Sequence, residues 1–172
     1  MPYPVEVHHR IRRDEPADYI GTARSLGACV DVVSIQYDDA IWGGDDGASV
    51  LDFLAALDVP AVATLHAIHR EPTDRQRAIL GRLIDGVQAT VVMSDAAATL
   101  LTTAYGIRSD RVEHIPHGTP NLPLVDADAV KPGLDLADRS VLLSFGLLGP
   151  AKGYELAIDW RPGNVADDST GC

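Results

Sequence analysis

The stretch FGLLGPAKG, residues 145–153, has the composition of a loop that binds anions. It follows the apolar run 141–144 and contains three glycines, a proline and Lys152. Glycines let backbone N–H groups come close to a ligand, and a lysine beside them supplies a positive charge. A buried strand that ends in such a loop is typical of a phosphate site, so we predict one at Gly146 and Lys152.

Four further segments with the pattern of strands are followed by polar residues or glycines. His66 ends the run AVATLH, Ser94 follows TVVM, and His117 and Gly118 follow VEHI closely. The run VDVVSIQ is followed by the glycine-rich loop 43–47. In open parallel sheets, ligands bind beyond the carboxyl ends of the strands. We therefore predict that these positions converge on one edge of a sheet. The loop residues included in this site are Gly43, Gly44, Asp45 and Asp46.

Each of these residues also has a purely structural interpretation. His66 can be a hydrogen-bonded histidine at the end of a strand, and His117 before a glycine is typical of a turn. Ser94 has the context of a helix cap, and Lys152 can be an ordinary surface lysine. The glycines at 43–44 can serve only the flexibility of a loop. The residue types alone leave both interpretations open.

Short β-branched runs alternate with segments of helical periodicity. We predict strands at residues 5–11, 30–36, 61–66, 90–93, 112–115 and 140–145. Helices are predicted from Pro16 to Gly27, after Gly47, from Thr73 to Ile84 and from Ser94 to Gly106. Strands joined by helices of this length require right-handed crossovers, hence a parallel sheet that helices cover on both faces. The predicted fold class is α/β, with a Rossmann-like parallel sheet flanked by helices.

The composition indicates a globular protein with an acidic surface. The 172 residues are 46% apolar and 23% charged, and the formal net charge is −11. This length suits one well-buried domain better than two. A nucleic-acid-binding protein needs a basic face, so the acidic balance argues against nucleic acid as a partner.

The cysteines and the N-terminus favour a cytoplasmic protein. Cys29 and Cys172 do not make a disulfide framework, which favours a reducing compartment. Residues 1–16 lack the apolar segment of a secretory signal peptide. No window approaches the roughly 18 apolar residues of a membrane-spanning helix. We therefore predict a cytoplasmic chain without a transmembrane segment.

Several enzyme classes have signatures that this sequence lacks. It contains no GxSxG motif of α/β-hydrolases, no GxGxxG motif after a strand and no P-loop. Two His-x-x-His pairs, His66 with His69 and His114 with His117, bring a metal hydrolase into consideration. Neither pair has the HExxH pattern and cysteine is scarce, so a metal hydrolase is the least favoured alternative.

Five runs together resemble the retaining glycosyltransferases of the GT-B fold, group 1 or family 4. They are DVVSIQYDDAIWGGDDG, VPAVATLH, VVMSDAAATLL, YGIRSDRVEHIPHG and VLLSFGLLGPAKG. The resemblance covers about residues 3–158 with the runs in the same order. It implies two Rossmann-like domains that face a cleft, in which the N-terminal domain binds the acceptor and the C-terminal domain binds a nucleotide-sugar.

The resemblance also implies roles for individual residues. The loop residues at 43–46 match the acceptor side, and His66 matches a histidine that points into the cleft near the transferred sugar. His117 and Gly118 match the segment before the interdomain linker, and with Ser94 they line the cleft. Gly146 and Lys152 match the element that grips the donor diphosphate. Retaining transfer of a hexose to a carbohydrate or other hydroxyl acceptor is implied, with His66 orienting groups and with no metal cofactor.

The sequence departs from the family pattern at internal positions and at both ends of the chain. Gln36 is followed by Tyr37 where the family usually has histidine, and Leu147 stands where it often has arginine. The family's first strand and glycine-rich turn precede the match to Tyr3, and its E-x7-E element should follow Lys152. We therefore expect a truncated chain with little or no transferase activity by itself.

The predicted organisation has four parts. Residues 1–120 form the acceptor-side domain without the first strand of the family, and 121–139 form the linker. Residues 140–158 begin the donor-binding domain as a strand, a loop and a helix, and 159–172 form an irregular tail. An alternative to an enzyme is a binding or interaction module of the same fold. A missing first strand would expose a sheet edge, which favours self-association.

Overall fold

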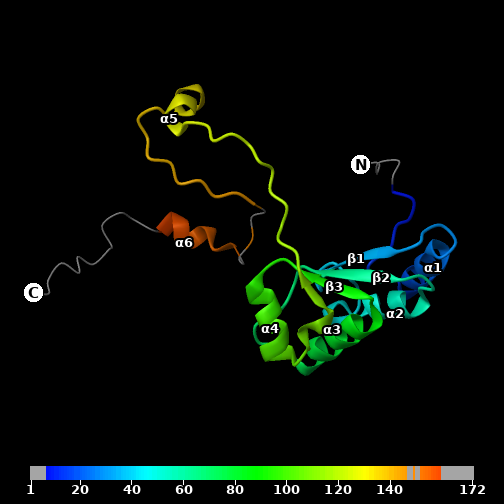
Figure 1. Ribbon diagram of the computed structural model, residues 1–172. Helices are drawn as coiled ribbons and strands as arrows, with labels where there is room; N and C mark the ends of the chain where they lie inside the picture. The colour runs from blue at the N-terminus through cyan, green and yellow to red at the C-terminus, as the bar shows by residue number, and fades with distance from the viewer. Residues whose placement is uncertain (1–6, 147–148, 150–151, 160–172) are drawn as a thin grey trace, which may run out of the picture. The chain divides into compact units, whose positions relative to one another are not determined.

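The computed structural model of the protein describes residues 7–146, 149 and 152–159. The chain divides into two compact units, Met1–Thr119 and Pro120–Cys172. We call them the first and second unit and describe each by itself (Figure 1). Among the described residues, no helix has both the length and the apolar character needed to cross a membrane.

The first unit is built on a four-stranded parallel sheet. Its strands are β1 (Val33–Tyr37), β2 (Ala61–Leu65), β3 (Ala89–Val92) and β4 (Val112–His114), in the spatial order β1-β2-β3-β4. The helices of the unit are α1 (Pro16–Leu26), α2 (Ser49–Ala56), α3 (Asp74–Gly86) and α4 (Asp95–Tyr105). Two short 3-10 turns, η1 (Asp45–Gly47) and η2 (Ser109–Arg111), complete it. The predicted α/β fold with a Rossmann-like parallel sheet is confirmed.

The strand order places the helices on one face of the sheet. Each connection moves to the next strand in the same direction, and right-handed crossovers in one direction put their helices on the same side. Burial agrees, because Ile35 and Tyr37 of β1 are buried whereas Ser34 and Gln36 on the opposite face are exposed. The prediction that helices cover both faces is therefore wrong for the described residues. Figure 1 shows α2 and α3 together below the sheet.

The core lies between this face and the helices. Tyr19 and Ala23 of α1 are buried beside α2, and Leu83 of α3 is fully enclosed. The buried apolar set is Tyr19, Ala23, Ile35, Tyr37, Val50, Phe53, Ala61, Ala63, Leu65, Ile79, Leu80, Leu83, Ile84, Val87, Val92 and Leu101.

The predicted helix ends are confirmed where a cap residue defines them. Thr73 and Gln76 form a capping box at the start of α3. The Ser94 hydroxyl accepts a hydrogen bond from the N–H of Ala97 at 3.2 Å. Gly106 closes α4 in the left-handed conformation, with φ of 69°, which glycine adopts without the steric cost that a Cβ imposes.

The predicted strand at residues 5–11 is not present in its described part. Residues 7–11 carry no regular structure, and 1–6 lie outside the described residues. Strand β1 also starts later than predicted, at Val33. The N–H groups of Cys29 and Val30 donate to the carbonyl of Leu26, so this segment continues the end of α1. β-branched composition alone cannot show which residues find a ladder partner.

The second unit contains only short helical segments among its described residues. These are α5 (Ala127–Val130), the 3-10 turn η3 (Lys131–Leu134) and α6 (Tyr154–Asp159). The predicted strand at 140–145 is not formed, and Leu142, Leu143 and Phe145 are exposed. A strand needs a neighbouring strand for its hydrogen bonds, and the described residues of this unit supply none. The predicted tail beyond residue 159 lies outside the described residues.

An ion pair between the N-terminal arm, residues 7–15, and α1 gives a pH-dependent prediction. Arg12 donates two side-chain hydrogen bonds to Asp18, each 2.8 Å long, and these bonds lower the pKa of Asp18 from 3.8 to about 2. The folded pKa is depressed, so the stabilisation is complete above pH 3.8 and is lost as the pH falls toward 2. Asp18→Asn should flatten this part of a profile of unfolding free energy against pH. Arg12→Gln should do the same, and an unchanged profile in both variants would contradict the pair.

Thr90 of β3 carries a hydroxyl that is buried without a hydrogen-bond partner among the described residues. An unsatisfied buried polar group costs free energy, and valine has nearly the same shape. Thr90→Val is expected to raise the free energy of unfolding by about 1 kcal/mol, measured by urea denaturation. Thr64→Val on the opposite, half-buried face of β2 is the control and should change stability by less than about 0.5 kcal/mol. A destabilised Thr90→Val variant would show that the hydroxyl is satisfied.

Candidate functional site

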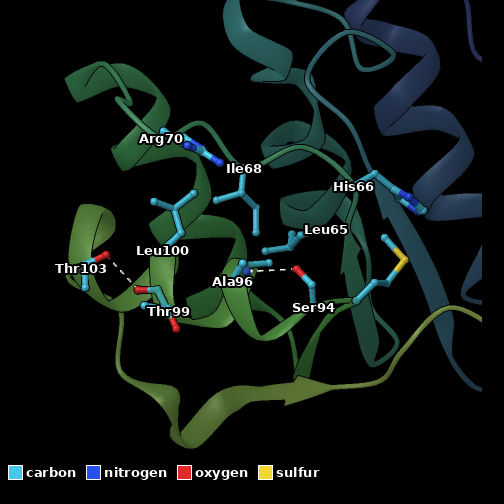
Figure 2. A pocket seen from close by; sticks show the side chains of 11 residues that line it. Leu65, His66, Ile68, Arg70, Ser94, Ala96, Thr99, Leu100 and Thr103 are labelled. Atoms are coloured by element: carbon cyan, nitrogen blue, oxygen red, sulfur yellow. Dashed lines mark hydrogen bonds between the residues drawn. The ribbon is translucent and has the colours of Figure 1, made fainter. Parts of the chain in front are cut away.

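A pocket opens beyond the carboxyl ends of β2 and β3. Its volume is about 630 Å³, and its walls come from the loop after β2 and from α4. Leu65 is the last residue of β2, and Met93 directly follows β3. His66 lies at the border of the pocket. Figure 2 shows Ile68 and Arg70 from the loop facing Leu100 of α4. We call this the β2–β3 pocket.

His66 is held in a defined orientation. Its backbone N–H donates to the carbonyl of Tyr37 at 2.8 Å, which continues the pairing of β1 and β2 by one residue. Its ring Nε2 lies 2.7 Å from Oε1 of Gln36, whose Nε2 donates to Oγ of Ser34 at 3.0 Å. Because a carbonyl oxygen only accepts, Nε2 of His66 is the donor. In the neutral ring Nδ1 is then an acceptor, and no described residue bonds to it.

His69 makes a second link, between the loop after β2 and the segment that follows β1. Its Nε2 lies 2.5 Å from Oδ2 of Asp39, and its backbone N–H donates to the Tyr105 hydroxyl at 3.0 Å. Burial raises the pKa of Tyr105, and burial followed by the charge of Asp39 raises the pKa of Tyr37. Both phenols therefore stay protonated and can act as hydrogen-bond donors. The loop that carries His66 is thus fixed at two points along its length.

The loop 43–47 lies beyond β1 but does not line the β2–β3 pocket. Its two carboxylates face α3: Asp45 pairs with Arg75 at 2.6 Å, and Asp46 lies 4.0 Å from the same guanidinium. The Tyr37 hydroxyl donates to the carbonyl of Asp46 at 3.1 Å. Gly44 has a φ of 74°, and Asp46 is also left-handed with φ of 55°. The acceptor-side role of Gly43, Gly44, Asp45 and Asp46 stays a prediction.

Ser94 caps α4, as its structural interpretation predicts, and it also lines the β2–β3 pocket, while its role in a substrate cleft stays a prediction. His117 and Gly118 are exposed and are not part of the pocket wall. The N–H of Ile115 donates to the carbonyl of Val92 at 3.0 Å, and the chain leaves the sheet after this bond. The pocket therefore brings His66 and Ser94 together and leaves the other two predicted cleft residues outside it.

The two predicted phosphate-binding residues belong to the second unit. Gly146 has a φ of 143°, and a Cβ there would lie 3.1 Å from the Tyr154 hydroxyl. Lys152 is exposed, and its backbone N–H donates to the carbonyl of Gly149 at 3.0 Å. Leu147 lies outside the described residues. Binding of a diphosphate by Gly146 and Lys152 stays a prediction.

Four site residues were missed by the sequence interpretation: Gln36, Asp39, His69 and Arg70. The signal that could have found three of them is the parallel register, in which Gln36 lies opposite Thr64. The two linked pairs have the same separation of 30 residues, so residues 36 and 39 face 66 and 69. His69 was considered only as a metal ligand. Arg70 has no such signal in the sequence.

The His-x-x-His pairs do not assemble into a metal centre in the described part of the chain. His66 bonds to Gln36 and His69 bonds to Asp39. Nδ1 of His114 lies 2.8 Å from Oδ1 of Asp95, at the start of α4. No group of three His, Cys, Asp or Glu side chains suited to one ion occurs among the described residues.

Comparison with known proteins identifies a family. A family model described as Glycosyltransferase Family 4 matches residues 30–120, just over half of the chain. The matched segment contains β1 to β4 and every residue of the β2–β3 pocket. No curated protein and no solved structure was found to match.

Proposed function

The chain belongs to glycosyltransferase family 4, and from this premise we propose that it transfers a sugar from a nucleotide-sugar donor to an acceptor hydroxyl. The observation that carries the proposal is the position of the β2–β3 pocket. It lies at the carboxyl ends of parallel strands, where such sheets bind ligands, and inside the segment that matches the family.

The first unit is proposed to bind the acceptor. The β2–β3 pocket offers His66 at its border, and the hydroxyls of Ser94, Thr99 and Thr103 in its walls. Nδ1 of His66 can accept a hydrogen bond from an acceptor hydroxyl, because Nε2 is engaged with Gln36. The links of the loop to Gln36 and Asp39 preorganise this atom, so little conformational entropy is lost when the acceptor binds.

The proposed reaction retains the configuration of the transferred sugar. The acceptor oxygen attacks the anomeric carbon on the face that the nucleoside diphosphate leaves, and the bond from that carbon to the phosphate oxygen breaks. The hydroxyl proton passes to the departing phosphate, which becomes more basic as the bond breaks. His66 orients the hydroxyl, while Gly146 and Lys152 stabilise the negative charge on the diphosphate. We also propose that the reaction needs no metal cofactor.

Acceptor binding by the first unit can be tested by NMR with ¹⁵N-labelled protein. Candidate hydroxyl compounds, such as monosaccharides, inositols and alkyl glycosides, are titrated separately from nucleotide-sugars. We expect at least one hydroxyl compound to shift the amide signals of residues 65–70 and 93–103. If nucleotide-sugars shift these signals and no hydroxyl compound does, the acceptor assignment is wrong.

An interaction module of the same fold is the second candidate, and one observation favours it. β1 pairs only with β2 among the described residues, so one of its edges has no neighbouring strand. Such an edge can pair with a strand of another molecule, including a second copy of this chain. Light scattering decides this point, since a monomer across a wide concentration range would rule out self-association through β1.

A further inference from the structure

Arg70 is a cation of the β2–β3 pocket that forms no ion pair with a described carboxylate. It lines the pocket, and it forms no ion pair or hydrogen bond with any described residue. Arg12 and Arg75, in contrast, are each held by a carboxylate. No aspartate or glutamate is among the described lining residues, although the whole chain has a net charge of −11. The pocket wall is therefore positively charged on an acidic protein.

The remainder of the pocket wall is largely apolar. Leu65 is buried at its base, and Ile68, Met93 and Leu100 are half-buried around it. Figure 2 shows Arg70 on the same side of the pocket as Ile68, with Leu100 facing them. A ligand that fills this space would place apolar surface against these side chains and a negative group beside the guanidinium.

The loop that carries Arg70 is anchored on both sides of Ile68, at His66 and at His69. His66 is bonded to Gln36, and His69, directly before Arg70, is bonded to Asp39 and Tyr105. These bonds fix the backbone from which the guanidinium extends. With the backbone held, only the Arg70 side chain must be ordered when its guanidinium binds an oxyanion through two parallel N–H bonds.

We propose that the β2–β3 pocket selects an acceptor that carries an oxyanion, such as a phosphate or carboxylate, next to an apolar part. This inference rests on the proposed function, and it names the acceptor class of the same site. Arg70 binds the oxyanion, the apolar wall binds the adjoining hydrocarbon, and His66 orients the reacting hydroxyl. A neutral sugar would leave the guanidinium without a partner.

The test measures binding of simple probes by isothermal titration calorimetry, below their micelle concentrations. The probes are octyl phosphate, octanoate, octyl glucoside and inorganic phosphate. We expect octyl phosphate to bind more tightly than octyl glucoside, because only the former satisfies Arg70. Octanoate shows whether a carboxylate serves as well as a phosphate, and inorganic phosphate shows how much the apolar part contributes.

Arg70→Gln is expected to weaken binding of octyl phosphate by about 10- to 100-fold and to leave octyl glucoside unchanged. Arg82→Gln, an exposed arginine of α3 outside the pocket, is the matched control and should leave both affinities unchanged. Arg70→Lys keeps the charge but not the fork, so it should fall between wild type and Arg70→Gln. Because Arg70 is exposed, these variants should keep the wild-type amide spectrum.

Two results would overturn the inference. One is equal binding of octyl phosphate and octyl glucoside, and the other is an equal loss in Arg70→Gln and Arg82→Gln. The test needs neither a donor nor turnover, so it is separable from the proposed transfer. Neutral hydroxyl compounds that bind at residues 65–70 as tightly as compounds with an oxyanion would keep the acceptor assignment and refute the anionic class alone.

Discussion

Gly43→Ala is expected to lower the free energy of unfolding by about 3 kcal/mol, a value typical of severe overpacking. A Cβ at this position would overlap the carbonyl oxygen of Arg13 and lie 2.9 Å from the Tyr19 hydroxyl. The same hydroxyl accepts from the N–H of Gly43 at 2.9 Å and donates to the carbonyl of Arg13 at 3.1 Å. The substitution must therefore separate the N-terminal arm, α1 and the loop after β1. Chemical denaturation followed by circular dichroism measures the loss.

Gly21→Ala is the matched control for this prediction. Gly21 lies within α1, and a Cβ added there would meet no described heavy atom within 4 Å beyond the neighbouring backbone of its own helix. Alanine has a higher helix propensity than glycine, so this variant should gain about 0.5–1 kcal/mol. The two substitutions make the same chemical change and are expected to act in opposite directions. A loss of less than about 0.5 kcal/mol in Gly43→Ala would contradict the contact with Arg13.

In any preparation in which wild type shows turnover, His66→Ala is expected to lower the rate of sugar transfer by about 100-fold, the size of effect that loss of precise positioning produces. Acceptor affinity should fall by about 10-fold, since one hydrogen bond to the acceptor is removed. His66 is exposed, so the free energy of unfolding should change little. Transfer from a radiolabelled donor measures the first effect, and NMR titration measures the second without turnover.

The control for His66→Ala is His8→Ala. His8 is an exposed histidine of the N-terminal arm, and it is not part of any element of the site. It should leave transfer and acceptor affinity at wild-type values. Equal acceptor affinity in His66→Ala and wild type would remove His66 from the acceptor site.

Helix limits in the first unit could be predicted because each depends on a few neighbouring residues. Local bonds form the start of α3, where Thr73 and Gln76 make a capping box. They also form both ends of α4, which Ser94 caps and Gly106 closes. Strands were predicted less accurately. The run at 140–145 has the composition of a buried strand, yet strand formation requires a partner that local composition does not encode.

The candidate site was predicted only in part, because some of its residues are set by local sequence and others by strand pairing. His66 and Ser94 follow strands, and the parallel arrangement brings the ends of β2 and β3 to one pocket. The partners Gln36 and Asp39 depend on register across two strands. The charge of Arg70 in the pocket depends on which side chains line it, and no described carboxylate is among them. Neither can be read from one segment of sequence.

The sequence by itself determined the α/β class, the capped helices and the strand-end positions of His66 and Ser94, because these follow from periodicity and from contacts within a few residues. The tertiary structure alone decided that the helices lie on one face of the sheet, that the loop 43–47 turns toward α3, and that Arg70 stands in an apolar pocket. These features depend on strand order and on pairs of side chains about 30 residues apart. Only the folded chain brings such pairs within bonding distance.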